Sequence, residues 1–193
     1  MKTDDELLEL IRHDQDLADL LGQTCEFDLS RGDHGATVSL SSGAALEAVA
    51  GDFTGGTFFL CGERRPARPV LYASSECQAG LIGRDLADAL AIMIGLPSWS
   101  DCLGFSGDGN LAVMRSAAEY LRRDEIESRP GADAERERLA TALSLTLAPI
   151  PVLLGRLHET VTATGPDFVL AEGPYEYESL FGPFLPSRNP LWR

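Results

Sequence analysis

The sequence predicts an α+β fold with a mostly antiparallel sheet, helices packed against it and extra helices toward the C-terminal end. Apolar residues recur at three- and four-residue steps near both ends of the chain, which is typical of amphipathic helices. Short apolar runs bounded by glycine fill residues 31–82 and indicate strands. With 193 residues, 44% of them hydrophobic, the chain can bury a core without a disulfide or a metal. We therefore expect one domain over residues 1–193.

The first section of this domain, residues 1–30, is predicted to be an acidic amphipathic helix. Its apolar stripe runs through 4–21, Thr3 and Glu6 form a capping box, and Gly22 stands just past the expected end. Residues 1–30 hold nine acidic and two basic side chains, so half of the net charge of −14 lies here. This face is either solvated or a docking surface for a basic partner.

The second section, residues 31–110, is predicted to form the sheet and its covering helix. Strands are expected at 36–40, 57–60, 70–72 and 78–82. A tight turn at 51–56 precedes the second strand, whose aromatic and β-branched residues suit a half-buried surface. The polar connection 62–69 favours antiparallel pairing of the second and third strands. A helix over 84–94, stopped by Gly95 to Pro97, should cover one face.

The third section, residues 111–193, is predicted to contain helices and a tail. Just before this section, a short helical segment is expected at 98–105. Asn110 then caps the first helix of the section, which bears a Glu119–Arg123 surface pair. Further helices are expected at 135–147 and 152–162. The tail should pack on the domain through its aromatic residues Tyr175, Phe181, Phe184 and Trp192.

The net charge and the hydropathy of the sequence limit the kinds of partner that we expect. A net charge of −14 disfavours direct nucleic-acid binding, which needs a basic stripe, and favours basic protein partners. No apolar run approaches the ~20 residues of a bilayer span, so no membrane partner is expected. The N-terminus lacks the pattern of an export signal, which favours a cytoplasmic protein of unassigned oligomeric state.

Residues with catalytic chemistry are scattered. The four cysteines show no paired spacing and the three histidines stand alone, so we expect no metal site and no cofactor. The stretch 104–109 lacks the second glycine of a nucleophile elbow. In the turn 31–35, Asp33 could orient His34, and His34 could activate a cysteine, which leaves a Cys/His hydrolase as the enzymatic alternative.

Partner-binding candidates come from charge and from one aromatic residue. The Trp99 segment, flanked by Asp101, could anchor a partner, although packing of Trp99 under the sheet is the alternative. The candidate partner-binding residues are Asp14, Asp16, Asp19, Asp33, Trp99 and Asp101.

The middle of the chain resembles the SUKH superfamily (Smi/Knr type). Four segments carry the resemblance: a glycine turn and strand at 50–60, a strand that is followed by an acidic residue at 69–76, the apolar run 79–82 and the helix 86–90. It covers less than a third of the chain, and the Leu-Pro step and Asn-Gly turn usual in that family are absent from 27–35. The resemblance implies a compact α+β domain. It also implies protein binding, since many members look like immunity proteins that neutralise toxins, often nucleases, by direct contact, and others are regulatory modules.

The sequence therefore predicts a non-enzymatic protein-binding module, most plausibly of the immunity type with a basic toxin as its partner. A regulatory or scaffold protein of the same fold is the alternative, followed by the hydrolase.

Overall fold

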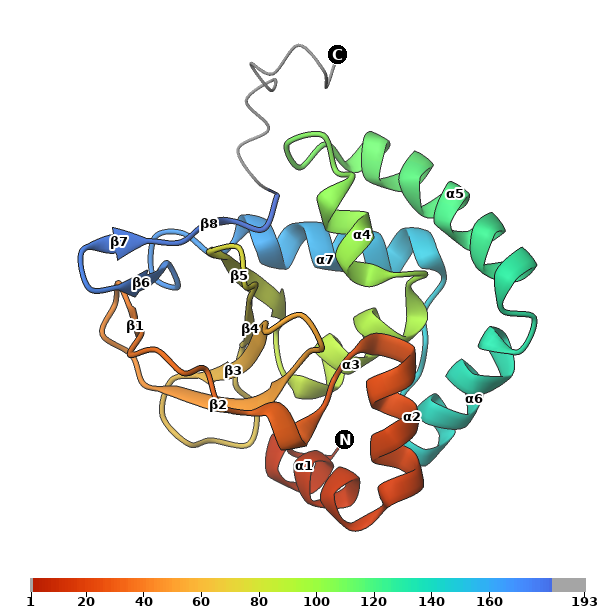
Figure 1. The fold of residues 1–193 in the computed structure, drawn as a ribbon, viewed down its shortest axis with the longest axis horizontal. Helices are drawn as coiled ribbons and strands as arrows, with labels where there is room; N and C mark the ends of the chain where they lie inside the picture. The colour runs from red at the N-terminus through yellow and green to blue at the C-terminus, as the bar shows by residue number, and fades with distance from the viewer. Residues whose placement is uncertain (1, 182–193) are drawn as a thin grey trace.

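The computed structural model describes residues 2–181, with the helices gathered on one side and two sheets on the other (Figure 1). The helices are α1 (Asp4–His13), α2 (Gln15–Cys25), the 3-10 helix η1 (Leu29–Arg31), α3 (Leu86–Gly95), α4 (Trp99–Gly104), α5 (Leu111–Ser128), α6 (Ala132–Leu143) and α7 (Ile150–Thr162). The strands are β1 (Ser39–Leu40), β2 (Leu46–Gly51), β3 (Thr57–Cys61), β4 (Val70–Ala73), β5 (Gln78–Gly83), β6 (Leu170–Glu172), β7 (Tyr175–Glu176) and β8 (Glu178–Ser179). The predicted α+β class is confirmed.

The larger sheet has the strand order β2-β3-β4-β5-β8, and the smaller one has the order β1-β6-β7. Strands β2 to β5 pair antiparallel, so the predicted hairpin between the second and third expected strands is confirmed, with Phe58 opposite Tyr72. Among the strands of residues 2–181, only β8 pairs parallel, with β5. The expected strand at 36–40 shrinks to Ser39–Leu40 because its partner is the short β6 near the chain's end.

The central strands β3 and β4 of the larger sheet are buried on both faces, whereas the sequence predicted a half-buried surface for β3. All five residues of β3 are buried. Phe58 and Leu60 join the apolar cluster under the helices, and Phe59 and Cys61 join a second cluster closed by the smaller sheet through Leu40 and Leu170. The continuous apolar run of β3 is thus the pattern of a strand covered on both sides.

Helix α3 occupies the centre of the helical layer. Every residue from Leu86 to Ile94 is buried, including Asp88, which pairs with Arg84 and Arg156. The helix is therefore covered on all sides rather than amphipathic. It packs on β5 and is surrounded by α1, α2, α6 and α7. The other helices therefore share one core with the sheet.

The predicted N-terminal helix over 4–21 is two helices. The chain breaks at Asp14, which is extended, and the Asp14 carboxylate accepts a hydrogen bond of 3.0 Å from the Leu17 amide to cap α2. Helix α2 continues past the expected stop at Gly22 to Cys25, where Glu26 in the left-handed conformation closes it. The capping box of Thr3 and Glu6 is confirmed.

The C-terminal half confirms the Asn110 cap of α5 and the apolar stripe of α7. The expected Glu119–Arg123 ion pair is wrong, because the Arg123 guanidinium lies over the Tyr120 ring, 4.6 Å from its centroid. Tyr175 is 77% exposed, so its predicted packing is also wrong, whereas Phe181 packs on the core. Phe184 and Trp192 lie outside the described residues. In residues 2–181, no helix has the length and apolar character to cross a membrane.

Candidate functional site

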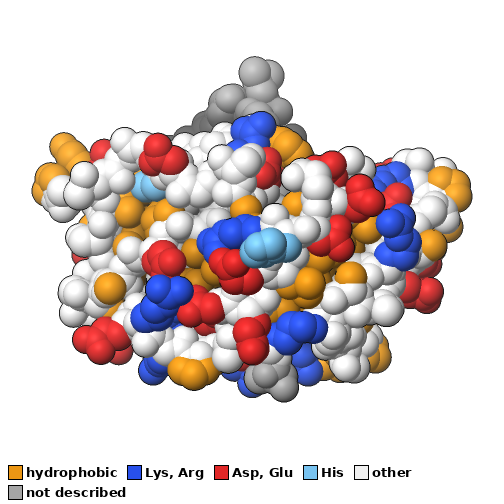
Figure 2. All heavy atoms as spheres, turned by 90° about the horizontal axis from the view of Figure 1, so that it is seen from below, with side chains coloured by type: hydrophobic (Ala, Val, Ile, Leu, Met, Phe, Trp, Pro, Cys, Tyr) orange, Lys and Arg blue, Asp and Glu red, His pale blue; other side chains and the backbone are white. Residues whose placement is uncertain are grey.

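Most carboxylates of α1 and the adjoining loops are engaged within the protein. Asp4 is buried and accepts hydrogen bonds from the backbone amides of Arg68 (2.7 Å) and Leu86 (3.0 Å). Three more acids form ion pairs: Asp5 with Arg64, Glu9 with Arg12, and Asp28 with Arg31. Seen from below the view of Figure 1, the surface accordingly mixes carboxylates with cations and apolar atoms (Figure 2). It is not the uniformly acidic face that the net charge suggests.

Four carboxylates without a cation partner lie together on α2 and its caps. Within residues 2–181, no Lys, Arg or His nitrogen lies within 4.0 Å of the carboxylates of Asp14, Asp16, Asp19 or Glu26. All four are exposed, and they belong to α2 or to its two caps. The structure therefore brings the predicted residues Asp14, Asp16 and Asp19 together on one element and adds Glu26, which the sequence analysis missed.

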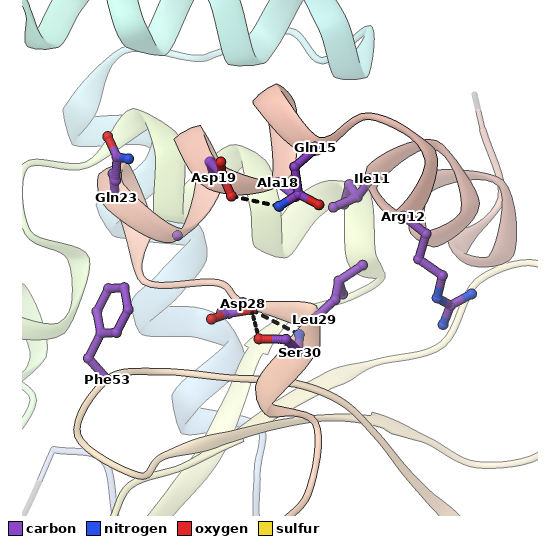
Figure 3. A pocket seen from close by; sticks show the side chains of 11 residues that line it. Ile11, Arg12, Gln15, Ala18, Asp19, Gln23, Asp28, Leu29, Ser30 and Phe53 are labelled. Atoms are coloured by element: carbon purple, nitrogen blue, oxygen red, sulfur yellow. Dashed lines mark hydrogen bonds between the residues drawn. The ribbon is translucent and has the colours of Figure 1, made fainter.

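A groove with an exposed aromatic ring runs beside α2, and we call it the Phe53 groove (Figure 3). It has a volume of about 460 Å³, and the apolar part of its lining comes from Ile11, Ala18 and Leu29. Asp19 of α2, Asp28 and Arg12 also line it. Phe53, at the tip of the β2–β3 turn, is 56% exposed, and the Arg31 guanidinium lies 5.1 Å from its ring centroid. Asp28 is paired with Arg31, so in the described residues Asp19 is the groove carboxylate without a cation within 4.0 Å. An apolar lining beside this carboxylate suits a partner side chain that has a long aliphatic stem and a cationic end, such as Lys or Arg.

The turn that carries Phe53 is fixed by the buried Asp52 carboxylate. One Asp52 oxygen accepts from the amides of Thr54 (2.8 Å) and Gly56 (2.7 Å), and the other accepts from the Tyr72 hydroxyl (2.5 Å). Burial opposes ionisation, but the hydrogen bonds from Tyr72, Gly56 and Thr54 outweigh it and hold the pKa of Asp52 below its usual value. A side chain at Gly56 would lie 2.4 Å from both Asp52 Oδ2 and the Tyr72 hydroxyl, so glycine is required there. Phe53 is thus presented on a rigid turn.

A second hollow, the Glu26 groove, flanks the C-terminal end of α2. It has a volume of about 280 Å³ and is lined by Glu26, Asp101 and Asp124. Burial raises the pKa of Glu26, and the nearby carboxylates of Asp52 and Asp101 raise it further. Glu26 (φ 60°) and Ser98 (φ 45°), two non-glycine residues with left-handed backbone, both line this groove. The predicted residue Asp101 therefore lies next to the α2 acids.

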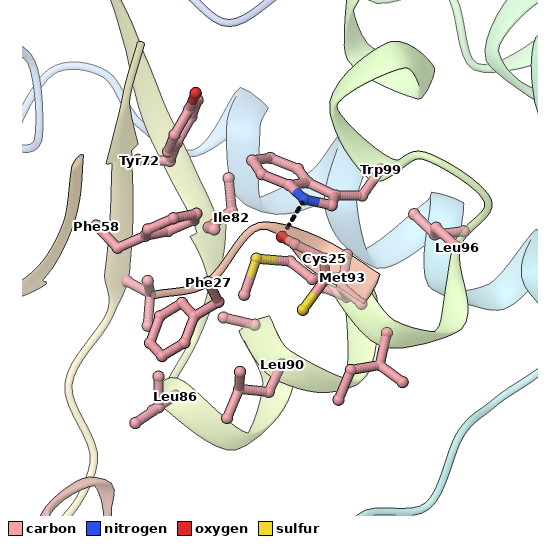
Figure 4. Close-up of a cluster of buried hydrophobic side chains, with 14 of the residues drawn as sticks. Cys25, Phe27, Phe58, Tyr72, Ile82, Leu86, Leu90, Met93, Leu96 and Trp99 are labelled. Carbon is pink, nitrogen blue, oxygen red and sulfur yellow. Dashed lines mark hydrogen bonds between the residues drawn. The ribbon is translucent and has the colours of Figure 1, made fainter. Parts of the chain in front are cut away.

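Trp99 does not serve as an exposed anchor. Its side chain is 4% exposed and its indole Nε1 donates to the Cys25 carbonyl over 3.2 Å (Figure 4). The ring packs edge-on against Tyr72 at 5.1 Å and lies 6.0 Å from Phe58. The alternative from the sequence, packing under the sheet, is what the structure shows. The aromatic residue that the protein offers to solvent near α2 is Phe53.

Asp33 lies apart from the α2 acids, in the connection between η1 and β1. Its carboxylate accepts from the Gly35 amide at 3.0 Å, and it lines a shallow hollow on the opposite side of the sheet with His34. The His34 Nδ1 contacts the Thr57 hydroxyl at 2.9 Å, and its Nε2 lies 3.4 Å from the Tyr177 hydroxyl. Burial lowers the pKa of His34. Asp33 does not form the expected hydrogen bond that would orient the His34 ring in the described structure.

The cysteines offer little thiolate chemistry. Burial raises the pKa of Cys25, Cys61 and Cys102 to about 12, so these three are thiols at neutral pH. Cys77, in the β4–β5 turn, is exposed. Among residues 2–181, His34 has no hydrogen bond to a cysteine, and no cluster of three or more His, Cys, Asp or Glu could hold a metal ion.

Comparisons with family models, with curated proteins and with solved structures give no significant match.

The sequence analysis missed two parts of the site for identifiable reasons. Phe53 stands in a Gly-Asp-Phe-Thr-Gly-Gly segment, whose composition predicts a turn but does not show which side chain the turn exposes. A large apolar residue at the tip of a polar turn is a signal of exposure that could have been used. Glu26 gave no local signal, because its proximity to Asp52 and Asp101 exists only in the folded chain.

Proposed function

We propose that this protein is a non-enzymatic binding module that docks a basic protein partner through α2 and the Phe53 groove. The observation that carries the proposal is the coincidence of unpaired carboxylates on α2 with an exposed aromatic residue beside them. Carboxylates that have no cation of their own exert their field on the solvent, where it attracts a basic surface.

The two features have separate roles in this proposal. The carboxylates of Asp14, Asp16 and Asp19 accelerate encounter and disfavour acidic competitors, because long-range attraction acts mainly on the association rate. Phe53 supplies a desolvated contact at the centre of the interface, where aromatic residues contribute most of the binding energy. The rigid Asp52 turn avoids an ordering cost on binding.

Within this class we propose an immunity-type protein that neutralises a basic toxin by direct contact in the cytoplasm. The resemblance of residues 50–90 to the SUKH superfamily supports this choice, as does the charge of α2. A regulatory or scaffold protein of the same fold would use the same surface without abolishing a partner's activity.

The test starts from the polypeptide encoded next to this chain's gene, purified and titrated against the protein. Association is measured by stopped-flow fluorescence at ~50 mM and ~500 mM salt, where the Debye lengths are about 14 Å and 4 Å. The double reversal Asp16→Lys with Asp19→Lys should slow association about tenfold or more at low salt and less than about threefold at high salt. Phe53→Ala should raise the dissociation rate by about tenfold.

Matched control variants carry the same kinds of substitution, two charge reversals or the loss of one aromatic ring, at positions outside α2 and the Phe53 groove. Glu127 and Glu137 are exposed and have no ion pair in residues 2–181, so Glu127→Lys with Glu137→Lys changes the net charge equally without touching α2. Tyr175→Ala removes an aromatic ring that is 77% exposed. If the α2 variant associates no more slowly than its control, the docking assignment is wrong.

A growth assay separates the immunity and regulatory functions. Co-expression should protect cells from the partner, and the α2 reversal should abolish protection. Binding that leaves the partner's activity intact would favour the regulatory alternative. Turnover of a substrate that is lost in His34→Ala or Cys77→Ser would overturn the non-enzymatic assignment.

A further inference from the structure

A third groove lies between α5 and α7, on a part of the surface that the proposed function does not use. Arginines predominate among its charged lining residues, whereas carboxylates predominate in the Glu26 groove. The α5–α7 groove has a volume of about 460 Å³, and its apolar lining includes Ala118, Ile150 and Leu154. Its rim carries Arg115, Arg122 and Arg123 against one carboxylate, Glu119. In a chain of net charge −14, three arginines around one apolar groove are a local reversal of sign.

Two of these arginines are not neutralised by the protein. Arg122 binds both oxygens of Asp133, at 2.7 and 2.6 Å, and also pairs with Glu125. Arg115, by contrast, has no hydrogen bond or ion pair within the described part of the chain. Arg123 has only the Tyr120 ring and a backbone carbonyl at 3.4 Å. The positive charge of Arg115 and Arg123 is thus available to a bound group.

Helix α5 also exposes apolar side chains outside the lining of the groove. Its 18 residues include only Met114 and Ala118 as buried positions. Val113 is 43% exposed, Tyr120 68% and Ile126 54%. Figure 1 shows α5 at the outer edge of the helical layer, with α7 on its inner side. A helix of this length with so little buried surface is typical of an element that receives a partner.

We propose that the α5–α7 groove binds an acidic amphipathic helix of another protein. The apolar side of such a helix, with leucines at three- and four-residue spacing, packs on Ala118, Ile150 and Leu154. Its carboxylates meet Arg115 and Arg123, which can form bidentate hydrogen bonds with them. The groove lies between two helices whose backbone groups are internally bonded, so side-chain packing rather than strand addition must hold the ligand.

Other occupants fit the groove less well. The remaining segment of this chain, 182–193, contains two arginines and no acidic side chain. Its charge has the same sign as that of the groove arginines, which repel it. A nucleic acid would gain phosphate contacts with the arginines, but its sugar-phosphate backbone offers no aliphatic side chains to the apolar floor of Ala118, Ile150 and Leu154. The combination of an apolar floor and unpaired arginines therefore favours a carboxylate-bearing amphipathic helix.

The experiment uses a fluorescein-labelled, 16-residue helical peptide with leucines on one face and glutamates flanking them. Its binding to the full chain is followed by fluorescence anisotropy at ~50 mM salt, and the contact surface is mapped by amide chemical shifts. Arg115→Glu with Arg123→Glu should weaken binding at least tenfold, because two attractive contacts become repulsive. Arg65 and Arg138 are exposed and have no ion pair in residues 2–181, so Arg65→Glu with Arg138→Glu is the matched control. It should change binding less than twofold.

Two further measurements keep the proposal falsifiable even where a protein variant unfolds. A peptide with serine in place of each leucine keeps its charge and should lose at least tenfold in affinity, and the shifts should centre on Ala118, Ile150 and Leu154. Equal binding of the serine peptide, shifts centred on α2, or equal weakening in the control variant would each overturn the proposal. Dodecanoate binding in the groove without peptide binding would also overturn it, in favour of a site for a small amphiphile.

Discussion

At the scale of single residues, the Asp52–Tyr72 hydrogen bond links the exposed Phe53 tip to the aromatic core. Asp52 is 3% exposed and Tyr72 is 7% exposed, so neither group can exchange its partner for water. Tyr72 also packs on Phe58 and Trp99, at centroid distances of 4.9 and 5.1 Å. One bond thereby couples the stability of the fold to the geometry of the candidate site.

This coupling predicts the effect of Tyr72→Phe. The pKa of Asp52 in the folded protein lies below the ordinary value of 3.8, so its stabilising contribution is complete above that value and is lost as the pH falls through the folded pKa. Tyr72→Phe should lower the free energy of unfolding by about 1.5–3 kcal/mol at pH 7, and by less at pH 3. Urea denaturation at both pH values measures the difference. Tyr120→Phe, at a position 68% exposed, should change stability by less than about 0.5 kcal/mol. A loss for Tyr72→Phe that is the same at both pH values would contradict this account.

At the scale of elements, the two-sided burial of β3 decides which aromatic residues stabilise the fold. Phe58 is fully buried and packs on Phe27, with ring centroids 5.1 Å apart. Phe58→Ala should therefore cost about 3 kcal/mol or more, because it leaves a cavity under the helices. Phe53→Ala, five residues earlier and exposed, should cost less than about 1 kcal/mol. Thermal and urea unfolding of both variants would check the ranking, and comparable losses would contradict the placement of Phe58 in the core and of Phe53 at the surface.

The elements themselves were predicted to different degrees. The sequence located β3, β4, β5 and α3, since each is rich in apolar residues and has a glycine or proline at or next to at least one end. It missed β2, whose Leu-Glu-Ala-Val-Ala-Gly run has little β-branched or aromatic content and forms a strand by pairing with β3. It also joined α1 to α2, because Asp14 resembles any polar residue of a helix face until its carboxylate is seen to cap Leu17.

At the scale of the whole molecule, the burial of three cysteines predicts how many thiols react with a reagent in the native protein. Cys25, Cys61 and Cys102 have pKa values of about 12 through burial, whereas Cys77 is exposed. A thiol-specific disulfide reagent at pH 8 should therefore modify one of the four cysteines rapidly in the native protein and all four in denaturant. Cys77→Ser should remove the rapid phase. Rapid reaction of two or more cysteines in the native protein would contradict the packing of the core.

The sequence by itself determined the α+β class, the main antiparallel hairpin and the acidic character of α2, because these follow from local periodicity and composition. Only the tertiary structure decided which charges remain unpaired, that Trp99 is buried while Phe53 is exposed, and that arginines gather beside an apolar groove on α5. The physical reason is that ion pairing and burial depend on distances between residues far apart in the chain. The spacing of Asp28 from Arg31 can be read locally, but the approach of Arg64 to Asp5 or of Glu26 to Asp101 exists only after folding.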